Sequence, residues 1–134
     1  MLRGVLGLAH ESQASAHQKG LSRNERLVGS TDFAKVFQAD CRSGDRLLLV
    51  LAIPNGLDRA RLGLAVGRKA IRLAVQRNRI KRLVRESFRQ RQHLLLGLDL
   101  VVVAKQAACG VSNWQLRSTL ERHWRKVLQY LHSE

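Results

Sequence analysis

The segment from Gly67 to Arg89 constrains the fold of this chain more than any other. Ten of the 24 Lys and Arg residues lie between Arg68 and Arg91, against a single acid, Glu86. At about 100° per residue, one side of a helix in this segment is apolar and must be buried. The residues of that stripe are Leu73, Ile80, Leu83, Val84 and Phe88. We therefore expect an amphipathic helix over residues 73–92 that packs on a core.

The opposite side of this helix carries a predicted column of basic and polar residues. Its members are Asn78, Lys81, Arg82, Arg85 and Arg89, with Arg79 beside them. Like charges at this spacing repel one another, at a cost of a few tenths of a kcal/mol per close pair. A solvated face kept for solubility is one interpretation, but such faces usually interleave Glu with Lys. Arg instead holds phosphate oxygens with a planar, two-pronged fork, so we predict nucleic-acid binding.

The overall charge and length agree with this prediction. A net charge of +14 favours a phosphate-bearing partner. A membrane-surface protein could share that charge, but no apolar run approaches the roughly 18 residues that span a bilayer. The 134 residues suffice for one domain: we expect a disordered extension over 1–21 and a single α+β domain over 22–134. Cys41 and Cys109 are too few for a disulfide framework or a zinc site, and we predict free thiols in a reducing cytoplasm.

Flanking segments supply the remaining elements. Capping residues at 30–32 precede Phe33, Val36 and Phe37 at helical spacing, which predicts a short helix. Its two rings either pin the helix to the core or line a groove for unpaired bases, and the pattern leaves both open. Strands are predicted over 46–53, 61–67 and 98–105. The predicted class is α+β, a small mixed sheet packed by helices in the order α-β-β(-β)-α-β-α.

A closing amphipathic helix completes the chain. Ser112 and Gln115 form a plausible capping box at its start. Its apolar stripe comprises Leu116, Leu120, Trp124, Val127, Leu128 and Leu131. Trp114, in the first turn, lies outside this stripe and has no assignment from the pattern.

No constellation of catalytic residues stands out. The ten acids and five His lack the spacing for metal-assisted phosphodiester cleavage or for a general acid–base pair. His93 and His123 are expected at helix ends or on the surface, and Asp99 to face solvent or cap a neighbour. We predict no catalytic residue and no metal bound by this chain.

The run Arg77-Asn78-Arg79-Ile80-Lys81-Arg82-Leu83-Val84-Arg85-Glu86-Ser87-Phe88-Arg89 closely resembles the protein subunit of bacterial ribonuclease P. The likeness extends from about Arg26 to Leu131 and takes in Phe33-Ala34-Lys35-Val36-Phe37, residues 61–69 and residues 98–105. It implies the fold of that family, which a ribosomal-protein domain shares. In that fold a left-handed βαβ crossover departs from the usual right-handed rule.

The resemblance also implies a function. In that family a ribonucleoprotein endonuclease removes the 5′ leader of precursor tRNA, and the catalytic RNA, with its magnesium ions, performs the hydrolysis. The protein would bind that RNA, in a 1:1 complex, and the leader of the precursor; we expect it in the cytoplasm, away from membranes. The implied contacts to the RNA subunit are Arg68, Lys69, Arg72, Arg77, Asn78, Arg79, Lys81, Arg82, Arg85 and Arg89. The implied leader contacts are Phe33, Phe37, Leu49, Leu51, Ala65, Lys69, Asn78 and Arg82.

Two rival functions share parts of this pattern. A ribosomal-type RNA-binding protein would have the same size, charge and fold class, and only the Arg-Asn-Arg run in its setting separates it. A stand-alone nuclease is disfavoured because no acid or His constellation exists. This chain also has leucines, at 47–49 and 51, where some members of the family carry an aromatic in the first long strand.

Overall fold

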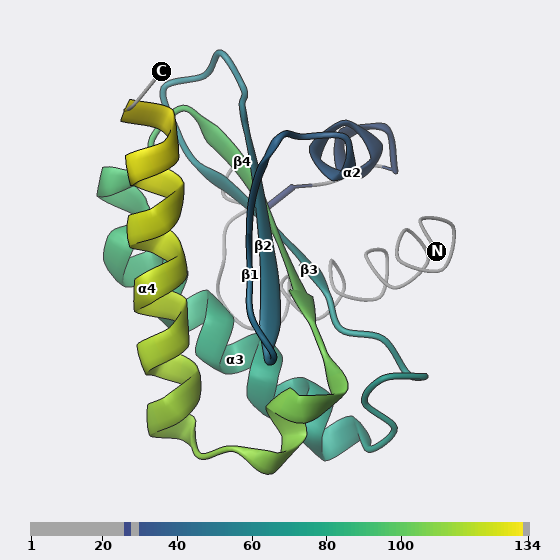
Figure 1. Cartoon of the computed structure of the whole chain (residues 1–134). Helices are drawn as coiled ribbons and strands as arrows, with labels where there is room; N and C mark the ends of the chain where they lie inside the picture. The colour runs from purple at the N-terminus through teal and green to yellow at the C-terminus, as the bar shows by residue number, and fades with distance from the viewer. Residues whose placement is uncertain (1–25, 28–29, 133–134) are drawn as a thin grey trace.

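A four-stranded mixed sheet forms the centre of the molecule (Figure 1). The structure is a computed structural model that describes residues 26–27 and 30–132, so the predicted N-terminal extension over 1–21 lies outside the described residues. The strands are β1 (Cys41–Gly44), β2 (Leu48–Pro54), β3 (Arg61–Ala65) and β4 (Leu98–Ala104). Their spatial order is β1-β2-β4-β3, with β3 and β4 parallel and the other two pairs antiparallel.

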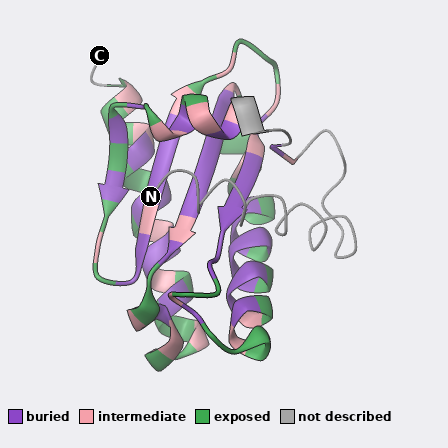
Figure 2. Cartoon of the chain, turned by 90° about the vertical axis from the view of Figure 1, so that its right-hand side faces the viewer, coloured by how far each residue is buried: buried purple, intermediate pink, exposed green. Residues whose placement is uncertain are grey.

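The parallel pair is joined by a crossover through the long basic helix α3 (Ala74–Arg91). Figure 2 shows the face of the sheet that α2 covers, so α3 lies behind the strands in that view. When the molecule is turned so that α3 is toward the viewer and both strands point up, β4 lies to the left of β3. The crossover is therefore left-handed, as the family resemblance implied. The predicted fold class and order of elements are confirmed. The prediction allowed a further strand before α3 without placing it, and the structure has that strand as β1.

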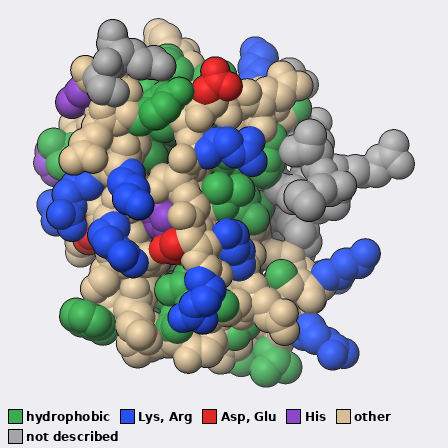
Figure 3. Space-filling view, viewed as in Figure 1, with side chains coloured by type: hydrophobic (Ala, Val, Ile, Leu, Met, Phe, Trp, Pro, Cys, Tyr) green, Lys and Arg blue, Asp and Glu red, His purple; other side chains and the backbone are tan. Residues whose placement is uncertain are grey.

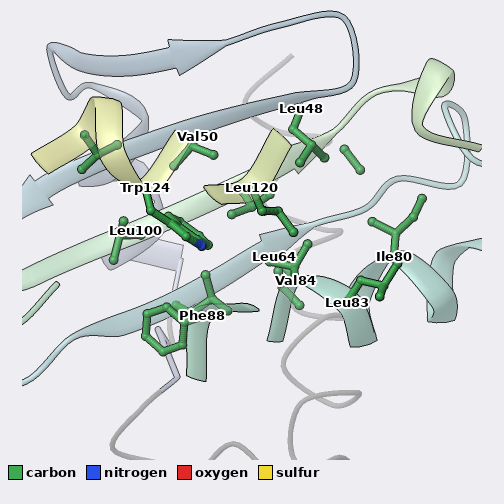
Figure 4. Packing of buried hydrophobic residues seen from close by; sticks show 14 of the residues in the cluster. Leu48, Val50, Leu64, Ile80, Leu83, Val84, Phe88, Leu100, Leu120 and Trp124 are labelled. Atoms are coloured by element: carbon green, nitrogen blue, oxygen red, sulfur yellow. The ribbon is translucent and has the colours of Figure 1, made fainter. Parts of the chain in front are cut away.

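Helices cover both faces of the sheet. The helices α3 and α4 (Asn113–His132) lie on one face, and the short helix α2 (Ser30–Phe37) lies on the other. The short 3-10 helices η2 (Gln92–Leu94) and η3 (Gln106–Gly110) flank β4. Beneath α3 and α4, Phe88 and Trp124 meet edge to face with centroids 6.5 Å apart, and the Trp124 indole donates to Ser87 Oγ over 2.9 Å (Figure 4).

The predicted stripe of α3 packs as expected except at its first residue. Ile80, Leu83, Val84 and Phe88 are buried in the main core, whereas Leu73 is 64% exposed. Leu73 is the N-cap residue, with an extended backbone at φ −86° and ψ 128°, so it does not follow the helical phase. The predicted burial of Leu73 is therefore wrong.

Local capping at the start of α4 agrees with the sequence. The Ser112 amide donates to Gln115 Oε1, and the Gln115 amide donates to Ser112 Oγ, both over 3.1 Å. This reciprocal pair confirms the capping box, which satisfies two amides that have no partner within the helix. Cys41 and Cys109 are free thiols, as predicted.

On the second face of the sheet, α2 packs against the edge strand β3. Phe33 is fully buried, and a Cβ placed on Gly63 would stand only 2.4 Å from its Cζ, so the ring lies directly against the glycine backbone. At the start of β3, Arg61 forms a bidentate pair with Asp99, at 2.8 and 2.6 Å. Its Nη1 also lies 3.7 Å from Asp32 Oδ2 in α2. Asp99 is thus a buried ion-pair partner, and the expectation that it faces solvent is wrong.

Candidate nucleic-acid interface

Exposed basic and polar side chains extend from the end of β3 along the outer side of α3. The exposed members of the predicted RNA-contact set are Arg68, Lys69, Arg72, Asn78, Arg82 and Arg89; we call them the α3 surface. The first three belong to the loop that leads into the helix, and the others lie on its solvent side, which is exposed in Figure 2. Only Glu86 adds an exposed acid to this side of α3.

The two arginines of the Arg-Asn-Arg run hold the structure together. Arg77 is 9% exposed, and its Nη1 donates to the carbonyls of Ile71 and Arg72, each over 2.9 Å. This bond closes the loop onto the first turn of α3. Because the backbone already uses this guanidinium, it presents little to a ligand.

Arg79 links α3 to the connection between β4 and α4. Its guanidinium donates to Val111 O over 2.7 Å, Ala108 O over 3.2 Å and Asn113 Oδ1 over 3.1 Å. Arg79 is half-buried. Asn78, between these two arginines, is the exposed residue of the run.

The predicted basic column is not uniformly exposed. Lys81 and Arg85 are only 3% and 2% exposed. At about 100° per residue Lys81 lies about 100° from Ile80, beside the buried stripe, which accounts for its burial. Arg85 lies about 140° from Ile80, close to the exposed Asn78 and Arg89, so helical phase alone does not account for its burial. Burial, with a contribution from nearby Arg89, lowers the pKa of the Arg85 guanidinium. The expectation that these two side chains point to solvent is wrong.

The predicted leader contacts fall into two groups on the α2 face of the sheet. Phe33, Leu51 and Ala65 are buried in the cluster beneath α2, at 0%, 0% and 2% exposure. Phe37 and Leu49 are partly exposed at its border. Lys69, Asn78 and Arg82 are exposed and belong to the α3 surface.

Strand register adds residues to this border that the sequence analysis did not name. Leu49 pairs with Val103, and Val103 pairs with Ala65, so one row crosses three strands. Val103 and Ile53 are partly exposed beside Phe37 and Leu49. We call Phe37, Leu49, Ile53 and Val103 the α2 border. Alternation along β2 and β4 could have identified Ile53 and Val103, had their pairing been known.

A buried polar cluster joins the β1–β2 turn to α4. His123, 2% exposed, receives a hydrogen bond from Ser43 Oγ at Nδ1 (2.7 Å), and its Nε2 lies 3.1 Å from Asp45 Oδ2. Because the Asp45 carboxylate only accepts, the fitting tautomer carries its proton on Nε2. The expectation that His123 lies on the surface or at a helix end is wrong.

The charges of this cluster are set by its environment. Partial burial acts to raise the pKa of Asp45, but hydrogen bonds from Thr119 and from the Leu48 and Leu47 amides outweigh it and lower that pKa to about 2. Burial lowers the pKa of His123, against the attraction of Asp45. Asp45 is therefore ionised and His123 neutral at pH 7. Ser43 and His123 are buried and bonded to each other, so the trio braces the fold and offers no open nucleophile.

Comparison with known proteins identifies this architecture. A family model described as Ribonuclease P matches residues 21–128. The chain belongs to the ribonuclease P protein family. A ribonuclease P protein component from Methylococcus capsulatus is 53% identical over 105 residues, 78% of this chain and 82% of the relative. One from Pseudomonas aeruginosa is 40% identical over 112 residues, 83% of each chain.

Solved structures of ribonuclease P proteins are similar to this one. The Staphylococcus aureus protein shares 30% identity at a TM-score of 0.70, covering 75% of this chain and 93% of that one. The Thermotoga maritima protein shares 34% identity at a TM-score of 0.64, covering 73% and 93%. Membership of the ribonuclease P family decides against the ribosomal-type alternative. No helix in the described ranges is long and apolar enough to cross a membrane.

Proposed function

We propose that this chain is the protein component of a ribonuclease P holoenzyme and assists removal of the 5′ leader from precursor tRNA. The observation that carries the proposal is the α3 surface, in a chain that belongs to this family. Each phosphate that such a surface neutralises releases counterions, so its RNA affinity should depend steeply on salt. The partners are the catalytic RNA, in a 1:1 complex, and precursor tRNA, in the cytoplasm.

Two surfaces divide the work in this proposal. The α3 surface docks on the catalytic RNA through exposed Arg and Lys side chains, since guanidinium groups bind phosphate oxygens in pairs. The α2 border, continuous in the fold with the buried Phe33 cluster, contacts the unpaired leader through Phe37 and its apolar neighbours. Lys69, Asn78 and Arg82 contribute to both contacts.

Hydrolysis is assigned to the RNA subunit and its magnesium ions. Within residues 26–27 and 30–132, no three His, Cys, Asp or Glu side chains gather closely enough to hold a metal ion. The proposal therefore leaves the magnesium ions to the RNA, since these residues offer no cage made of protein ligands alone. What this chain supplies is charge neutralisation and the positioning of RNA.

Reconstitution tests the proposal. The protein is mixed with its RNA subunit and a precursor tRNA at low magnesium, with the protein alone and the RNA alone as controls. We expect leader removal with both components, and none with the protein alone. Hydrolysis by the protein alone would contradict the assignment of chemistry to the RNA.

Variants separate the two surfaces. Arg82→Ala should weaken binding to the RNA subunit and reduce the salt slope by about one, whereas Arg125→Ala, an equal charge change on the outer side of α4, serves as the control. Phe37→Ala should weaken binding of a precursor with a leader by roughly fivefold, from about 1 kcal/mol of lost stacking. Equal losses for precursor and leaderless tRNA would remove the α2 border from the leader site.

A further inference from the structure

A hollow of about 410 Å³ lies between the first turns of α4 and the β1–β2 turn. Its lining comprises Asp45, Arg46, Leu47, Trp114, Gln115, Ser118 and Arg122. None of these belongs to the α3 surface or the α2 border. Its size falls within the range of small-ligand sites, about 300–1,000 Å³.

Trp114 is the feature of this hollow that the core does not explain. Its side chain is 73% exposed, the highest value among the large hydrophobic residues that are exposed in the described chain. At about 100° per residue it lies about 160° around α4 from the buried Leu116 and about 120° from the buried Leu120, so packing on the sheet does not require it. An exposed indole offers a flat, rigid stacking surface and an N–H donor.

Two guanidinium groups stand in the same hollow. Arg46 is exposed, and the described residues provide its side chain with no ion pair. Arg122 is 64% exposed along its side chain; its Nη2 donates to Thr119 Oγ1 over 3.0 Å, and lies 3.9 Å from Asp45 Oδ2. Lys and Arg side chains also face the viewer over the α4 side of the molecule in Figure 3.

The one acid of the hollow is already engaged. Asp45 Oδ1 accepts from the amides of Leu47 and Leu48, each over 2.8 Å, and Oδ2 accepts from Thr119 and His123. The carboxylate is thus held in the buried cluster beneath the hollow. It orients Arg122 without cancelling the charge of Arg46.

The hollow borders the RNA-docking side of the molecule. Arg79 of α3 donates to Asn113, the residue before Trp114. An RNA that docks on the α3 surface can therefore continue across the start of α4 to reach the indole.

We propose that this hollow binds an unpaired RNA nucleotide, with its base stacked on Trp114 and its flanking phosphates held by Arg46 and Arg122. An aromatic ring between guanidinium groups is the arrangement that binds single strands without sequence preference. A base inside a duplex is already stacked on both faces, so apart from its two end pairs a duplex should not occupy the site. The inference rests on the proposed function and adds a third RNA contact to it.

Tryptophan fluorescence provides the first test. A single-stranded oligouridylate of about ten nucleotides is titrated into the protein, with an RNA duplex of equal length as the comparison. Trp124 is 2% exposed and bonded to Ser87, so a change on binding reports Trp114. We expect quenching by the single strand only. No change at saturating RNA, or equal quenching by the duplex, would overturn the inference.

Variants provide the second test. Trp114→Ala should weaken single-strand binding about tenfold, whereas Trp114→Phe keeps a ring and should retain affinity within about threefold. Leu96→Ala, at 57% exposure on another loop, is the control for loss of exposed apolar surface. Arg46→Ala should lower the salt slope, with Arg125→Ala as its charge-matched control. Equal affinity of Trp114→Ala and the wild type for single-stranded RNA would contradict the proposal.

Assays on the assembled complex identify which RNA supplies the nucleotide. Weaker association of Trp114→Ala with the RNA subunit assigns the nucleotide to that RNA. Weaker precursor binding to a normally assembled holoenzyme assigns it to the precursor. If Trp114→Ala behaves as wild type in both assays while Arg82→Ala loses affinity, the hollow is not an RNA site, yet the proposed function stands. If RNA affinity is absent in the wild type, the proposed function itself fails.

Discussion

Substitution of Arg79 should separate arginines that hold the fold together from those that we propose to bind RNA. In Arg79→Ala the carbonyls of Ala108 and Val111 lose a charged donor, as does the Asn113 side chain. A hydrogen bond to a charged group contributes about 1.5–3 kcal/mol. The 2.7 Å bond to Val111 should carry most of this, and the two longer ones less, since Arg79 is only half-buried. We expect a loss of about 2–3 kcal/mol in the free energy of unfolding.

The assay is thermal and urea unfolding, followed by RNA titration at several salt concentrations. For a domain of this size the loss corresponds to a fall of roughly 10 °C in Tm. Arg82→Ala, an exposed neighbour, should change stability by less than about 0.5 kcal/mol, yet lower the salt slope of RNA binding by about one. Folded Arg79→Ala should keep the wild-type slope. An unchanged Tm, together with a reduced slope, would refute the reasoning.

Two further predictions concern stability. Gly63→Ala should cost about 1–3 kcal/mol in urea unfolding, because its Cβ would lie 2.4 Å from the buried Phe33 ring, whereas a Cβ at Gly44 meets only a flexible leucine terminus at 3.2 Å; equal costs for the two alanines would contradict the close packing. The pKa of Asp45 falls from 3.8 to about 2 on folding. The ionised carboxylate should therefore contribute about 2 kcal/mol to the free energy of unfolding above pH 4, and this contribution should be lost as the pH falls toward 2. The pKa of His123 is lowered by burial, so its contribution, complete above about pH 6.5, should decline below that value. His123→Gln should abolish the decline of the urea midpoint below about pH 6.5. If the decline persists in this variant, a group other than His123 causes it.

The elements of this fold are largely encoded by local pattern. The helix predicted over 73–92 runs from 74 to 91, and the strands predicted over 61–67 and 98–105 run over 61–65 and 98–104. Periodicity and capping decide these segments within a few residues, which is why Ser112 and Gln115 identified the start of α4. The strand β1 was not located from the sequence, which allowed a further strand before α3 without placing it, because the four residues of β1 carry no long apolar run.

The candidate site was less predictable, since each error involves partners distant in the chain. Arg79 is recruited by carbonyls about 30 residues away. His123 is buried because Asp45, 78 residues earlier, and Ser43 meet it across the β1–β2 turn. No periodicity in either segment signals such contacts.

The sequence by itself determined that a basic, amphipathic helix must pack on a small sheet and leave a charged surface exposed. Only the tertiary structure decided which basic residues form that surface, and it withdrew Arg77, Lys81 and Arg85 from solvent. Charge and spacing along one helix are local properties. Burial, and the hydrogen bonds that a guanidinium makes, depend on which loops and strands the folded chain brings beside it.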